Sequence, residues 1–280
     1  MKWIAVIALL ALGACAPSPP PPVSVAPPPG PVPSFASRPY EPFNRADTVA
    51  IALREWRLFG AKVDDSAPET RPVPLPADKP ERQPGLWQRV GEYWWIGLAV
   101  PAGAAVPREE SWTGKHDEAG GLFPASDDGR YAWSAAFISY VMRIAGAGPR
   151  FPYSANHYTY VNAAAAGTSP ILQALAPNAY APRLGDLICF GRGGSEGLKF
   201  ADLPTSHGWP GHCAFVVASQ PGNLSIIGGN VDDAVTLTHV PVTEGGMLAQ
   251  ADGTILDQRY HWFVVLRVLY DAETEPAGNE

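Results

Sequence analysis

Residues 131–142 read YAWSAAFISYVM, and this stretch predicts a central helix. Apolar residues lie on nearly every side of the expected helix, so it should be buried. The helix should run from Trp133 to Ala145 and end at Gly146, with Ser134 in its first turn. A helix N-terminus carries about half a positive charge, which favours a nucleophile or an oxyanion there. Ser134 is therefore the first candidate functional residue.

Helical patterns surround this segment, and strand patterns follow it. Amphipathic or apolar helices are expected at residues 47–59, 87–98, 133–145 and 154–165. Strands bounded by Gly, Pro and Asn turns are expected at residues 186–190, 212–218, 223–228, 234–240 and 261–269. Helices followed by strands indicate an α+β fold, with N-terminal helices packed on a largely antiparallel sheet.

The N-terminus is typical of an exported protein. Residues 1–14 combine Lys2 with an apolar run that is too short to span a bilayer, which fits a signal peptide. Leu12-Gly13-Ala14-Cys15 resembles the lipobox of bacterial lipoproteins, which implies cleavage before Cys15 and lipid on its thiol. Ala16, rather than Asp, implies the outer membrane as destination, with the protein facing the periplasm. A plain signal peptide is the alternative.

Composition divides the rest of the chain. Residues 15–40 form a Pro-rich tether, residues 41–271 a single domain and residues 272–280 an acidic tail expected to be disordered. The net charge of −7 argues against nucleic acid as a partner. Export to an oxidising compartment would allow Cys189 and Cys213 to form a disulfide, although buried free cysteines remain the alternative.

Four separated motifs carry a resemblance. They are Trp133-Ser134-Ala135-Ala136-Phe137, Gly185-Asp186-Leu187, His212-Cys213 and Gly228-Gly229-Asn230. In this order they resemble the nucleophile helix, the Gly-Asp-Leu strand, the catalytic His strand and the third polar position of NlpC-type and CHAP-type papain-like peptidoglycan hydrolases. Together with Glu92-Tyr93-Trp94 and Phe151-Pro152-Tyr153-Ser154, they resemble a bacterial lipoprotein family of unknown function, domain-of-unknown-function family 2272, related to those hydrolases.

The resemblance implies a catalytic set of Ser134, His212 and Asn230. Ser134 would attack an amide carbonyl, His212 would accept its proton and Asn230 would orient the imidazole. Ser stands where those hydrolases use Cys, and a hydroxyl needs an accurately placed base. Asp232 and Asp233 are alternatives to Asn230. Ser134 could instead be a helix N-cap, a favoured role of serine.

Other candidates are weighed against simple packing. Trp133, His157 and His207 are candidate groove residues, but His157 has surface or packing roles as its alternative. The aromatic residues of the helix at 87–98 either line a groove or pack in the core. No cofactor motif appears, and no set of converging metal ligands is expected.

Two functions remain open at this point. The first is an outer-membrane lipoprotein that hydrolyses amide bonds of peptidoglycan with Ser134 as nucleophile. The second is an inactive module that keeps the same groove to bind cell-wall peptide or to act as a scaffold. A Cys189 or Cys213 nucleophile is disfavoured, because neither residue is expected at a helix start.

Overall fold

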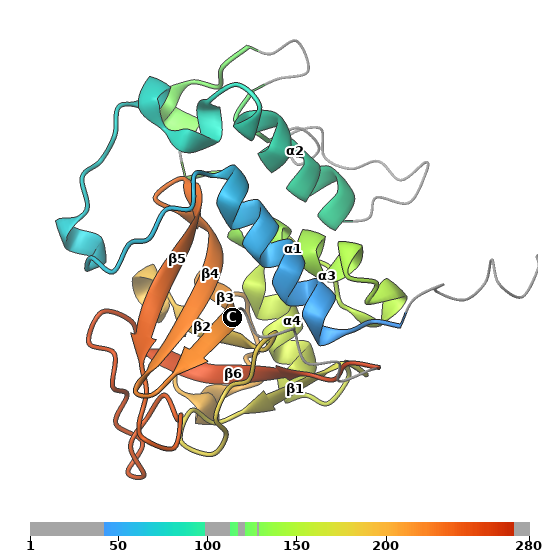
Figure 1. Ribbon diagram of the computed structural model, residues 1–280, viewed down its shortest axis with the longest axis vertical. Helices are drawn as coiled ribbons and strands as arrows, with labels where there is room; N and C mark the ends of the chain where they lie inside the picture. The colour runs from blue at the N-terminus through green and yellow to red at the C-terminus, as the bar shows by residue number, and fades with distance from the viewer. Residues whose placement is uncertain (1–41, 99–112, 117–120, 128, 272–280) are drawn as a thin grey trace, which may run out of the picture. The chain divides into compact units, whose positions relative to one another are not determined.

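Four α-helices and a six-stranded antiparallel sheet make up the regular structure of the residues that the computed structural model describes, which are 42–98, 113–116, 121–127 and 129–271 (Figure 1). The helices are α1 (Arg45–Leu58), α2 (Leu86–Gly97), α3 (Ser134–Ile144) and α4 (His157–Ala165). The strands are β1 (Leu172–Leu175), β2 (Leu187–Gly191), β3 (Gly211–Gln220), β4 (Asn223–Val231), β5 (Ala234–Pro241) and β6 (Trp262–Val268). The α+β prediction is therefore confirmed.

The order of strands across the sheet is β1-β6-β2-β3-β4-β5, with every neighbouring pair antiparallel. Side chains alternate between the two faces of the sheet. Cys189, Cys213 and Phe215 share the main core with the helices, whereas Ile188 and Ala214 belong to a second core on the other face. The two faces of the sheet therefore contribute to two separate hydrophobic cores.

Helix α3 is the centre of the main core. Every residue from Ser134 to Met142 is buried, as the apolar pattern of this stretch predicts. Helix α2 approaches it closely at Gly97, where an added Cβ would lie 2.7 Å from the carbonyl oxygen of Ala136. Only glycine permits that contact between the two helices.

The expected helices and strands lie within a few residues of the observed ones, but the sequence reasoning missed β1. Residues 172–175 pair with the outer side of β6, which makes β1 a short edge strand. The region 61–84, between α1 and α2, contains short 3-10 turns at Pro68–Thr70, Pro76–Asp78 and Pro80–Arg82. Proline at the first position of each turn has the backbone angle that a helical turn needs.

Cys189 and Cys213 form a disulfide between β2 and β3. The two residues are direct partners in the antiparallel register, and both are fully buried. This decides the alternative that the sequence left open. Because the side chains of residues 212 and 213 point to opposite faces of the sheet, His212 does not share the face of the disulfide.

The predicted signal peptide, lipidated Cys15, tether and acidic tail lie outside the described residues. Among the helices that the structure does describe, none has both the length and the apolar character needed to cross a membrane.

Candidate functional site

Ser134 is the first residue of α3 and makes a short hydrogen bond with a histidine. Its Oγ lies 2.6 Å from Nε2 of His157, the first residue of α4. The N-cap of α3 is Trp133, and no side chain caps this end. Ser134 is therefore not the N-cap that one alternative expected. The first N–H groups of a helix have no intrahelical acceptor, so Oγ lies beside a region of positive potential.

His157 is held on its other ring nitrogen as well. Nδ1 contacts the hydroxyl of Tyr160, one turn further along α4, and both side chains are buried. Burial, and in second place the positive charge of Arg192, together lower the pKa of His157 to about 3. The imidazole is thus neutral at physiological pH, and one of its nitrogens can accept a proton.

His212 lies next to this pair. Its ring centroid is 5.6 Å from that of His157. Burial, followed by His157 and Arg192, lowers the pKa of His212 well below its ordinary value. Gly228 on β4 makes room for the ring, since a Cβ there would lie 2.5 Å from Nε2 of His212. The structure therefore joins Ser134, His157 and His212 in one buried group.

Trp133, the N-cap residue of α3, is held in place by a buried hydrogen bond. Its Nε1 donates to Oε2 of Glu81 at 2.6 Å, and Oε1 of Glu81 lies 3.0 Å from the ammonium of Lys115. Gly229 packs against the same region, because a Cβ there would approach Phe137 at 2.6 Å and Trp133 at 2.8 Å. Trp133 is fully buried, so it is a core residue and not part of a groove surface as the sequence suggested.

A cleft of about 920 Å³ lies on the other face of the sheet. His212, Asn230 and Arg192 line it, but Ser134 and His157 do not. Ser134 is 3% exposed and His157 is 5% exposed. His212 thus connects the open cleft with the more enclosed Ser134–His157 pair.

The predicted third residue, Asn230, lines the cleft with His212, but no hydrogen bond joins the two within the described part of the chain. Its backbone has a φ of 57° at the irregular end of β4. Asp232 and Asp233 form the two-residue hairpin turn to β5 and pair with cations, Asp232 with Lys62 at 2.9 Å and Asp233 with Lys79 at 3.0 Å.

His207 lies in a separate hollow, lined also by Leu198 and Trp209, so it does not share a cleft with His212. Asp186 is structural in its contacts. It is buried, and it accepts hydrogen bonds from the backbone of Val268 and Arg183 and from the hydroxyl of Tyr180. Within the described ranges, no group of three or more His, Cys, Asp or Glu side chains is arranged to hold a metal ion.

The sequence singled out His212 as the partner of Ser134, whereas the observed hydrogen bond is to His157. Sequence reasoning also missed Tyr160 and Arg192. The only local sign was a histidine at the start of a helix, with a tyrosine three residues later on the same face.

Acid should destabilise the fold through His157. The unfolded chain binds a proton below pH 6.5, whereas the folded protein resists it until about pH 3, so the free energy of unfolding falls as pH drops through this window. Between pH 7 and 5 this histidine should account for a loss of about 2 kcal/mol. Urea unfolding should show a pH difference smaller by that amount in His157→Gln. His207→Gln, at an exposed histidine, is the control, and equal pH dependence in wild type and both variants would contradict the expectation.

The sequence profile of one family matches residues 81–268, and the family is described as an uncharacterized protein conserved in bacteria, DUF2272. Searches of curated proteins and of solved structures found no match.

Proposed function

The chain belongs to the DUF2272 family of uncharacterised bacterial proteins, and from the geometry of its site we propose that it is a serine-type hydrolase of amide bonds in peptidoglycan. The observation that carries this proposal is the contact of 2.6 Å between Oγ of Ser134 and Nε2 of His157 at the start of a buried helix. A nucleophile and a base within hydrogen-bond distance are the minimum for acyl transfer by serine.

The chemistry follows from the two ring nitrogens. When Nδ1–H of His157 donates to the hydroxyl of Tyr160, Nε2 is free to take the proton of Ser134. Oγ then bonds to the amide carbon, and the carbonyl oxygen takes the negative charge near the N-terminus of α3. The proton on Nε2 passes to the leaving amine as the C–N bond breaks. Water, deprotonated by the same nitrogen, then attacks the acyl carbon. The bond to Oγ breaks, the proton passes from Nε2 to Oγ, and the free acid leaves.

The proposed substrate rests on the sequence. The motifs around Ser134, Asp186 and His212 resemble those of NlpC-type and CHAP-type hydrolases, and a helix-borne nucleophile followed by an antiparallel sheet is compatible with a papain-like fold. The lipobox resemblance at Cys15 supports an outer-membrane lipoprotein that faces the periplasm. The Cys189–Cys213 disulfide supports an oxidising compartment.

A second candidate function is a cell-wall-binding module without turnover. The observation in its favour is the low exposure of Ser134 and His157, 3% and 5%, beside a cleft that is lined by His212 but by neither of these two residues. In this alternative the cleft would hold a cell-wall peptide, and the serine would stabilise α4 through His157.

Incubation of the full chain with purified sacculi separates these functions. Mass spectrometry of the soluble products should show released fragments with wild type and none with Ser134→Ala, and the product ends name the bond. Ser134→Cys tests whether the groove can still position a substrate, because a thiolate at a helix N-terminus is the stronger nucleophile. Release by this variant alone would show a competent groove without an active serine. Absence of products with wild type, together with sedimentation of the chain with sacculi, would favour the binding module.

A further inference from the structure

Arg192 stands at the open end of the histidine group. It follows β2 in the chain, it is exposed, and it lines the same cleft as His212. Its positive charge acts on both buried imidazoles and contributes to the lowered pKa of His157 and of His212. No carboxylate among the described residues forms an ion pair with its guanidinium. An uncompensated cation therefore faces the space from which a ligand would reach the site.

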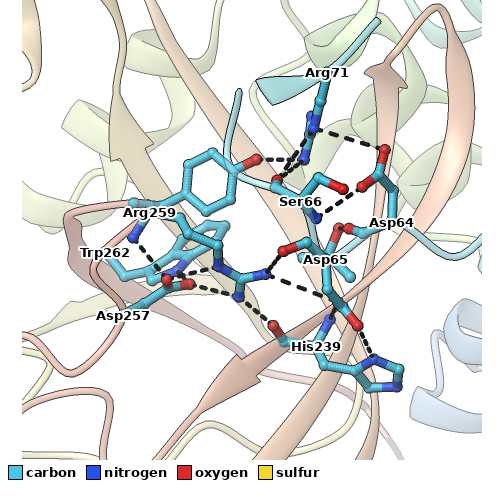
Figure 2. A network of polar contacts seen from close by, with 10 residues as sticks. Asp64, Asp65, Ser66, Arg71, His239, Asp257, Arg259 and Trp262 are labelled. Atoms are coloured by element: carbon cyan, nitrogen blue, oxygen red, sulfur yellow. Dashed lines mark hydrogen bonds and ion pairs between the residues drawn. The ribbon is translucent and has the colours of Figure 1, made fainter. Parts of the chain in front are cut away.

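The other arginines of the cleft are already engaged. Figure 2 shows Arg71 held by Asp64 and Ser66, and Arg259 held by Asp65 and Asp257. Arg71 also donates to the hydroxyl of Tyr260 at 2.6 Å, and Arg259 donates to Oδ1 of Asp257 at 2.9 Å. These contacts hold residues 64–71 beside the cleft. The two guanidinium groups therefore stabilise the wall of the cleft through bonds to other protein groups.

Most carboxylates of the cleft also have partners within the protein. Asp232, Asp233 and Asp257 each pair with Lys or Arg of the protein. Glu196 is exposed on the loop that follows Arg192 and forms no described ion pair. The half-buried rings of Phe190 and Tyr260, with centroids 4.6 Å apart, add an apolar surface beside these charges. The cleft therefore combines one available cation with an apolar wall.

We propose that Arg192 binds a carboxylate of the substrate, so that the protein selects cell-wall peptides that carry a free carboxyl group near the bond at Ser134. A guanidinium forms paired hydrogen bonds with a carboxylate, which fixes orientation as well as affinity. The bound anion also offsets the positive charge that opposes protonation of His157 during attack. This inference rests on the proposed function for its substrate, but the binding it describes does not require turnover.

Binding is measured with the full chain carrying Ser134→Ala, which prevents turnover. The probes are soluble peptidoglycan fragments, untreated or with their carboxyl groups converted to methylamides. Calorimetry should show that the untreated fragments bind about ten- to a hundredfold more tightly than the methylamides. Adding Arg192→Gln should remove this preference, whereas Arg183→Gln, at an exposed arginine outside the cleft, should keep it. Glu196→Gln should leave the preference intact or strengthen it.

The outcomes separate this inference from the proposed function. Equal binding of the two fragment preparations, or no binding of either, overturns the role of Arg192 as a carboxylate receptor. Loss of binding with Glu196→Gln overturns it too, because it indicates recognition of an amine. Cleavage by wild type that ignores carboxyl blocking leaves the hydrolase standing without this specificity. Binding that depends on Arg192 without cleavage leaves the receptor standing without the hydrolase.

Discussion

Replacing His157 by Gln should lower the rate of fragment release from sacculi about a thousandfold, whereas His212→Gln should reduce it much less. His157 is the histidine that contacts Oγ of Ser134, at 2.6 Å, so its loss removes the proton acceptor. His212 lies beyond His157 as seen from Ser134, with the centroids of the two imidazole rings 5.6 Å apart, and it lines the cleft. Initial rates of release, measured with equal amounts of folded protein, give the comparison.

The opposite ranking would return the role of base to His212, which the sequence motifs favour. Because both imidazoles are buried, each variant needs a thermal unfolding curve to show that it is folded. Tyr160→Phe provides a milder control, because it removes the hydroxyl on Nδ1 of His157 but keeps the ring in the core. It should reduce the rate less than His157→Gln does.

The position of Ser134 could be predicted because it depends on local sequence. An apolar run of helical length identified α3, and the change to strand patterns after residue 186 identified the sheet. The helix start, the buried environment and the α+β class all follow from such patterns. The short edge strand β1 could not be found in this way, because four residues carry too little alternation.

The partner of Ser134 could not be predicted because it depends on how two helices pack. His157 is 23 residues away in the chain, on α4, and no local pattern tells that its Nε2 points at the start of α3. The pairing of Cys189 with Cys213 required the register of β2 and β3, which sequence left undetermined. Arg192 gained its significance only when the partners of Arg71 and Arg259 were known.

Glu81→Ala should destabilise the protein by about 3–5 kcal/mol, the largest effect on stability that we expect from a single substitution. Glu81 is fully buried, and its carboxylate serves both the ammonium of Lys115, at 3.0 Å, and Nε1 of Trp133, at 2.6 Å. Removing it leaves a buried cation without this partner and a buried indole N–H without its acceptor. Urea unfolding at pH 7 measures the loss, with Glu69→Ala at an exposed position as the control.

Glu81→Gln separates the two contributions. An amide keeps an acceptor for Trp133 but loses the charge that faces Lys115, so its cost measures the ion pair. Burial raises the pKa of Glu81, with the charge of Asp233 acting in the same direction and Lys115 opposing both. If the carboxyl were neutral in the folded protein, Glu81→Gln would be nearly without cost. Because Trp133 precedes Ser134 at the start of α3, a loss of cleavage rate in Glu81→Gln that exceeds its loss of stability would show that this buried pair also positions the nucleophile.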